Sequence, residues 1–135
     1  MVTYTADAVA LLVYLVDCLP QPADRVFAEA EAGETVIQAP STALAEALYS
    51  ISRDKDVRGV QLIGTPEAAR RALLANGPVS LAPGGEGELV EYVEVIEEFS
   101  IHDALVVASH REQGTDAVIT TDGGIRDAGV PTVWD

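Results

Sequence analysis

Residues 100–124 have the sequence SIHDALVVASHREQGTDAVITTDGG, and this stretch is the most informative about the fold. Ser100 and Asp103 have the spacing of a capping box, which predicts a helix over residues 101–112. Residues 104–108 are all apolar, so the first turns of this helix are expected to be buried on every side. The apolar and β-branched run 117–122 predicts a buried strand, with a turn at Gly123 and Gly124. A buried helix followed by a buried strand is typical of a parallel α/β sheet.

The same alternation of strands and helices extends over the rest of the chain. Further strands are predicted at residues 2–6, 35–38, 79–81 and 131–134. Helices are predicted from residue 8 up to the prolines at 20 and 22, and then at 23–32, 41–51 with Ser41 as its cap, 66–76 behind Thr65, and 86–99. This order favours a central, mainly parallel sheet of four to five strands that is covered on both faces. No repeat or linker interrupts it, so one domain over residues 1–135 is expected.

Length and composition exclude several classes of protein. The chain has 135 residues, of which 48% are hydrophobic, so it is not a disordered acidic tail. The longest uncharged apolar run, residues 8–16, is far shorter than the roughly 20 residues that a membrane span needs. The N-terminus lacks the features of a signal peptide, and Cys18 is the only cysteine. We therefore expect a soluble, cytoplasmic protein without an intramolecular disulfide.

The charge balance is strongly acidic. Twenty-two acids oppose eight bases, and Lys55 is the only lysine. So negative a field opposes the approach of nucleic acid unless metal ions or salt intervene. Adaptation to a salt-rich cytoplasm, in which such charges are screened, is favoured over a dedicated cationic partner.

Four acids are candidates for one shared site. Asp7 and Asp122 stand at the ends of two predicted strands, and parallel neighbouring strands would bring them to the same edge of the sheet. Glu46 and Asp103 lie in predicted helices that could face this edge. Each also has an ordinary explanation, since Asp7 and Asp103 suit helix starts, Asp122 suits a turn and Glu46 suits a solvated helix face.

Asp103 fits its ordinary explanation least well. A carboxylate that enters buried surroundings needs a partner, because an unpaired buried charge is unfavourable. A cluster of acids without basic neighbours requires a cation, and ligands that offer only oxygen select hard divalent ions such as Mg²⁺ or Mn²⁺. The residue chemistry therefore suggests a metal site, but it does not show that the four acids lie together in the fold.

Four segments together carry a family resemblance: TAD at 5–7, TALAEAL at 42–48, SIHDALVVA at 100–108 and ITTDGGI at 119–125. In their order and separations they resemble the PIN-domain ribonucleases, and the third and fourth segments are the most specific. The size is similar to that of VapC-type toxins of toxin–antitoxin pairs. The abundant glutamate and glycine with a single lysine further resemble a haloarchaeal member.

The resemblance implies a fold, an activity and partners. The fold is a three-layer α/β/α PIN-like domain, and the activity is a Mg²⁺- or Mn²⁺-dependent endoribonuclease, a hydrolase that cuts RNA with metal-activated water. Asp7, Glu46, Asp103 and Asp122 would hold the metal, directly or through water, and Thr120 would order a ligand water or a phosphate. The family likeness also implies a homodimer and a small antitoxin that covers the acidic site.

Three positions depart from the family pattern. Val9 stands where serine or asparagine is usual, Gly124 where many members have a further aspartate, and Ile125 where an aromatic residue is usual. Fewer contacts around the metal imply weakened affinity and activity, since such losses typically amount to about 10–100-fold. A non-catalytic PIN-like protein-binding module and a housekeeping RNA-processing nuclease therefore stand as alternatives.

Basic residues are concentrated after the Glu46 helix. Five of the eight bases lie between positions 53 and 71: Arg53, Lys55, Arg58, Arg70 and Arg71. Arg53 and Arg58 are the candidates for binding the RNA backbone near the acids. The alternative is that these bases interact with helix ends and form surface ion pairs with nearby acids.

Overall fold

Five parallel strands form the central sheet of the computed structural model, which describes residues 1–135. They are β1 (Thr3–Ala6), β2 (Val36–Ala39), β5 (Val79–Leu81), β6 (Ala117–Ile119) and β7 (Thr132–Val133), in the order β5-β2-β1-β6-β7. All four pairings are parallel, and Thr5 is in register with Gln38 on one side and Val118 on the other. The predicted parallel sheet is confirmed.

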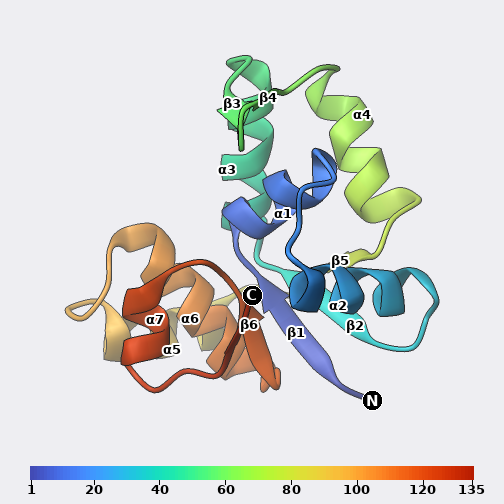
Figure 1. Cartoon of the computed structure of the whole chain (residues 1–135). Coiled ribbons are helices and arrows are strands. Elements are labelled where there is room, and N and C mark those ends of the chain that lie inside the picture. The colour runs from blue at the N-terminus through green and yellow to red at the C-terminus, as the bar shows by residue number, and fades with distance from the viewer.

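Helices cover the sheet in a three-layer α/β/α arrangement. They are α1 (Ala8–Leu15), α2 (Gln21–Glu31), α3 (Ser41–Ser52), α4 (Pro66–Arg70), α5 (Glu86–Val95), α6 (Ile101–Gln113) and α7 (Gly123–Asp127), with a π-helical segment, η1 (Arg71–Ala75), after α4. Figure 1 shows α1, α3 and α4 gathered on one side of the molecule and α5, α6 and α7 on another. None of the helices combines the length and apolar composition that crossing a membrane requires.

Two hydrophobic clusters correspond to these two groups of helices. The larger cluster joins α1–α4 to strands of the sheet, and in it the fully buried ring of Phe27 stacks on Tyr14 with 4.6 Å between the ring centroids. The smaller cluster contains Val95, Ala104 and Val107, together with Ile125 from α7. Ala104 and residues 106–108 are buried as predicted, but Leu105 is half-buried and Ile101 is 60% exposed, so the start of this helix is not buried on every side.

Several local predictions need correction. Ser41 does not cap α3, because Pro40 occupies the cap position in extended conformation and Ser41 is the first helical residue. The strand predicted over residues 117–122 ends at Ile119, and the Gly123–Gly124 turn is the start of the short helix α7. The helix predicted over 86–99 ends at Val95.

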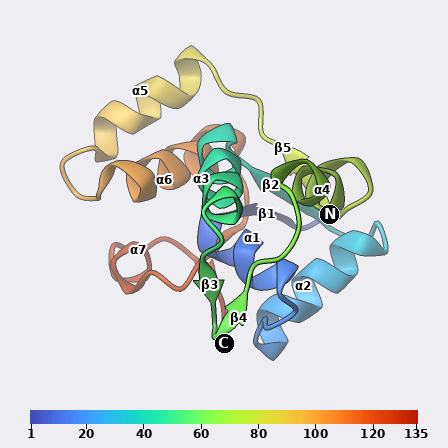
Figure 2. The ribbon, with the colours of Figure 1, turned by 90° about the horizontal axis from the view of Figure 1, so that it is seen from above.

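A β-hairpin at the end of α3 was not predicted. It consists of β3 (Asp56–Val57) and β4 (Val60–Gln61), and its turn residues Arg58 and Gly59 have φ angles of 54° and 78°. Two successive positive φ angles are typical of a two-residue type I′ turn, for which Arg-Gly is not a strong sequence signal. Figure 2 shows the hairpin extending from α3 on the side of the C-terminus, where Arg58 contacts Trp134.

The order of the strands creates a crevice between β1 and β6. From β1 the chain proceeds to β2 and β5 on one side, and then crosses back to β6 on the other side of β1. Ligands of open α/β sheets bind at such a reversal, beyond the carboxyl ends of the two strands. Asp7 and Asp122 follow these two ends.

Candidate active site

Asp7 lies at the bottom of the crevice and is only 8% exposed. Its Oδ1 accepts a hydrogen bond from the Ala10 amide at 2.9 Å, which caps α1, and its Oδ2 accepts from the Thr120 hydroxyl at 2.5 Å. Burial raises the pKa of Asp7, and the negative charges of Glu46 and Asp122 act in the same direction, whereas the two hydrogen bonds oppose them. Asp7 is thus a rigidly held carboxylate beside two other acids.

Asp103 and Asp122 are hydrogen-bonded to each other across the crevice. Burial, the bond to Asp122 and the charge of Asp122 raise the pKa of Asp103 to about 6. The pKa of Asp122 is lowered, first by this bond and then by the amides of Ile125 and Gly124, from which its Oδ1 accepts at 3.2 and 2.7 Å. Below about pH 6 the pair therefore holds one proton between its two carboxylates.

Glu46 approaches the same crevice from α3. With Asp7 and Asp103 it lines a cavity of about 50 Å³, which has room for a cation and a few waters. The Glu46 side chain is 39% exposed, which agrees with the solvated helix face that its sequence context suggested, although it also borders this cavity. Its Oε1 lies 2.9 Å from Nδ1 of His102, a contact that the sequence did not reveal.

Thr120 connects the carboxylates to one another. Its side chain is buried, and its hydroxyl both donates to Asp7 and accepts from the Asp122 amide at 3.0 Å. The hydroxyl therefore fixes the distance between Asp7 and the loop that carries Asp122. Thr120 also lines a second cavity, together with Asp122.

The donor set fits a hard divalent cation in its chemistry. No lysine or arginine lies within ion-pairing distance of Asp7, Asp103 or Asp122. Only hydrogen bonds from the Thr120 hydroxyl and from backbone amides, and the proton of the aspartate pair at low pH, offset their repulsion. As the side chains stand, no group of three His, Cys, Asp or Glu residues is arranged to hold a metal ion directly. Each carboxylate is engaged by a protein partner, so direct ligation of a cation would require Asp103 to be ionised and Glu46 to leave His102, whereas ligation through waters would leave these contacts in place.

The departures from the family pattern are visible in the crevice. Val9 lines the small cavity beside Asp7 and is 40% exposed, so an apolar side chain occupies part of the rim. A Cβ atom on Gly124 would lie 3.0 Å from Oδ1 of Asp122. Glycine at this position thus leaves room for Asp122 to cap α7, which a larger residue would crowd.

The basic residues predicted to bind RNA are separated by the fold. Arg58 lines the second cavity with Thr120 and Asp122, but Arg53 lies over the ring of Tyr49, 4.7 Å from its centroid, and lines neither cavity beside the acids. Lys55 lines a groove along Glu46 and His102. Arg126 and Trp134, which the sequence did not single out, join Arg58 around the second cavity.

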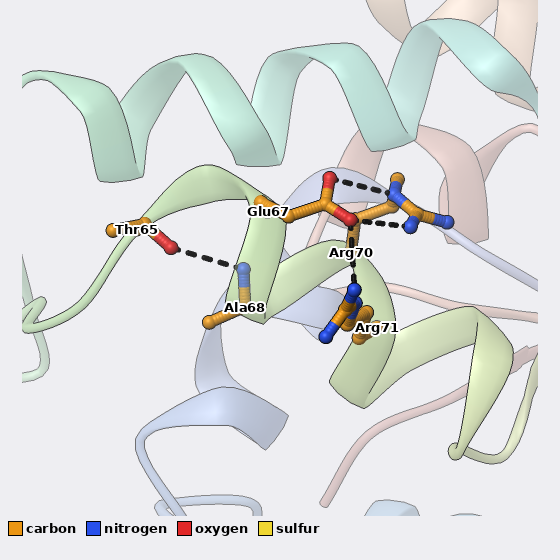
Figure 3. Close-up of polar contacts among 5 residues, drawn as sticks. All are labelled: Thr65, Glu67, Ala68, Arg70 and Arg71. Atoms are coloured by element: carbon orange, nitrogen blue, oxygen red, sulfur yellow. Dashed lines mark hydrogen bonds and ion pairs between the residues drawn. The ribbon is translucent and has the colours of Figure 1, made fainter.

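Arg70 and Arg71 have a different role. Both contact Glu67 within α4, with Arg70 Nη2 at 2.5 Å and Arg71 Nε at 3.4 Å from its Oε1 (Figure 3). Thr65 caps the same helix, as predicted, by accepting from the Ala68 amide (Figure 3). These two arginines form the surface ion pairs that the alternative interpretation expected.

Comparison with known proteins rests on structure alone. No family model matches the sequence, and no curated protein matches it. A chain of the VapBC2 crystal structure from Rickettsia felis, bound to a DNA fragment from the promoter, superposes with a TM-score of 0.70 at 16% identity, over 98% of this chain and 99% of that one. VapC20 of Mycobacterium tuberculosis, described as a Sarcin-Ricin loop cleaving toxin, gives 0.63 at 21% identity over the same fractions.

The chain has the PIN-like fold of VapC toxins. The VapC-like architecture predicted from the four segments is therefore confirmed, including its three layers and its parallel sheet. At these identities the likeness concerns the fold, and the roles of the four acids remain predictions.

Proposed function

We propose that the chain is a divalent-metal-dependent endoribonuclease and the toxin of a toxin–antitoxin pair. The observation that carries this proposal is the convergence of Asp7, Asp103 and Asp122, without any basic partner, at the crevice between β1 and β6. The VapC-like fold supports it, since VapC20 is described as cleaving the Sarcin-Ricin loop.

In this proposal Asp7, Glu46, Asp103 and Asp122 hold Mg²⁺ or Mn²⁺, directly or through water. When bound, the ion would lower the pKa of a water and neutralise charge on the phosphate. Asp7 is positioned by Thr120 and by the Ala10 amide, so it needs little reorganisation. Above pH 6 Asp103 is ionised and could serve as a ligand, and Glu46 would have to leave His102 to do so.

A non-catalytic protein-binding module is the second candidate. Two observations favour this candidate. An exposed apolar side chain, Val9, lies in the crevice, and His102 contacts Glu46. Such a module has no need of a metal ion, whereas both a toxin and a housekeeping RNA-processing nuclease require one. Metal binding therefore distinguishes the module from the nucleases.

Partners are proposed on the exposed apolar surface and on the VapC-like fold. Leu89, Val90 and Val93 on α5 are more than half exposed, as is Ile101 at the start of α6. We propose that a second copy of the chain or a small antitoxin covers part of this surface. Light scattering at several KCl concentrations tests the homodimer, and a monomer at all of them would contradict it.

The experiment that tests the metal site is calorimetric titration of Mn²⁺ in concentrated KCl, which suppresses loose condensation of cations on the acidic surface. Wild type is compared with Asp103→Asn and with Asp24→Asn, which changes an exposed acid of α2. Saturable binding of one or two ions that Asp103→Asn abolishes and Asp24→Asn preserves would support the proposal. Equal binding by wild type and Asp103→Asn would contradict the four-acid site, and no saturable binding at all would favour the module.

A further inference from the structure

A second cavity shares no lining residue with the small one but also borders the carboxylates. Its volume is about 380 Å³, and it is bounded by Arg58 of the hairpin, Thr120 and Asp122 after β6, Arg126 of α7 and Trp134 after β7. Thr120 and Asp122 line this cavity, whereas Asp7 and Asp103 line the small one. The Thr120 hydroxyl donates to Asp7 and so connects the two linings. A ligand in the larger cavity would thus lie next to the proposed metal site.

Two arginines and two acids line this cavity: Arg58, Arg126, Asp122 and Asp135. Arg58 makes no ion pair, and the nearest carboxylate to Arg126 is that of its neighbour Asp127, 3.9 Å away. Nη2 of Arg126 lies 3.6 Å from the position of a Cβ on Gly123, so the guanidinium lies against the loop that carries Asp122. Neither arginine is ion-paired to Asp122 or Asp135, so two of only eight bases can meet an anion here, and guanidinium groups suit phosphate.

An aromatic side chain completes the cavity. Trp134 is half-buried, and the guanidinium of Arg58 lies 5.6 Å from its ring centroid. The pair also borders a neighbouring cavity of about 240 Å³ beside Cys18 and Pro20. Trp134 is the one hydrophobic residue among the eight that line the larger cavity, so an apolar protein segment would find little to bury. Aromatic faces combined with arginines are typical of sites for single-stranded nucleic acid.

We propose that the larger cavity binds one nucleotide of a single-stranded RNA, adjacent to the phosphate that is cut. The base contacts Trp134, and Arg58 and Arg126 bind the phosphate, while the carboxylate of Asp122 faces both this nucleotide and the metal site. The size of the cavity is within the range of about 300–1,000 Å³ of small-molecule sites. The inference rests on the proposed ribonuclease function, for which it names a substrate subsite.

Binding can be tested without a metal ion and without cleavage. The probe is a fluorescently labelled, single-stranded 2′-O-methyl RNA hexamer in EDTA at moderate KCl, and its anisotropy gives the dissociation constant. Trp134 is the only tryptophan, so quenching of protein emission by unlabelled hexamer reports contact at this residue. The matched duplex and inorganic phosphate serve as competitors.

Three variants and one control localise the binding. Arg58→Gln and Arg126→Gln are each expected to weaken binding about fivefold or more, since each removes a charge-assisted contact. Removal of an aromatic side chain that stacks on a base typically weakens binding about 5–100-fold. Trp134→Phe keeps a smaller ring, so its loss of affinity is expected at the lower end of this range. Arg111→Gln, which changes an arginine of α6 outside this cavity, is expected to bind as wild type does.

Other outcomes would overturn the proposal. Equal affinities of wild type, Arg58→Gln and Arg126→Gln would show that the hexamer binds elsewhere, and so would binding without any change in Trp134 emission. Competition by duplex or inorganic phosphate as effective as that by the unlabelled hexamer would indicate charge attraction alone. These failures differ from failure of the ribonuclease function, because that function is judged by Mn²⁺ binding of Asp103→Asn, in which the arginines and Trp134 are intact.

Discussion

Asparagine in place of Asp103 is expected to stabilise the metal-free protein at neutral pH. In the folded protein, burial and the bond to Asp122 raise the pKa of Asp103 from 3.8 to about 6. Ionisation of Asp103 above pH 6 is therefore less favourable in the folded than in the unfolded chain, which lowers the free energy of unfolding. The asparagine amide has a similar volume and can donate to Asp122 without a proton to lose.

The size of this effect follows from the two pKa values. The difference between 3.8 and about 6 corresponds to about 3 kcal/mol. Because Asp103 keeps much of its surface in water, solvent screening reduces the expected gain to about 1 kcal/mol. The gain is complete above pH 7, shrinks as the pH falls through 6, and disappears once both states are protonated below the usual value of 3.8.

Urea unfolding in EDTA, at one KCl concentration and at two pH values, measures this difference. At pH 8 the midpoint of Asp103→Asn should exceed that of wild type by roughly 0.5 M, given a urea dependence of about 2 kcal/mol/M. Near pH 4.5 the gap should be markedly smaller, and Asp24→Asn should show no such change. A variant that is less stable than wild type at pH 8, or a gap that is equal at both pH values, would refute the shared proton.

Three further substitutions test the support of the site and of the core. Thr120→Val removes the hydroxyl that donates to buried Asp7, so the free energy of unfolding at pH 7 should fall by about 1.5–3 kcal/mol, as urea denaturation can measure. Phe27→Ala deletes a fully buried ring of the larger cluster, and thermal denaturation should show a loss of about 3–5 kcal/mol. Gly77→Ala would place a Cβ atom against the backbone carbonyl of Ala72, and limited proteolysis should reveal faster cleavage near η1; wild-type resistance would contradict the clash.

The fold and two of the candidate acids could be predicted because their signals are local. Short apolar runs separated by caps and prolines specify strands that alternate with helices, and this alternation favours a parallel sheet. Once β1 and β6 are parallel neighbours, Asp7 and Asp122 must follow at the same edge. The hairpin β3–β4 escaped prediction because its strands have two residues each and its Arg-Gly turn is a weak signal.

Contacts between distant segments were decided by the tertiary structure. The hydrogen bond from Thr120 to Asp7 joins residues 113 positions apart, and no periodicity encodes it. The same is true of the contact of Glu46 with His102. Such contacts depend on how helices and loops pack over the sheet.

In the second cavity, too, some features follow from the sequence and others only from the tertiary structure. By itself the sequence determined a strongly acidic α/β protein with acids at the carboxyl edge of its sheet, and it placed Arg58 in a basic stretch. Only the tertiary structure brought Arg58 from the hairpin to Arg126 and to Trp134 near the C-terminus, while it left Arg53 on Tyr49. The physical reason is that one turn with two positive φ angles sets the direction of the hairpin, and this direction selects which arginine reaches the crevice.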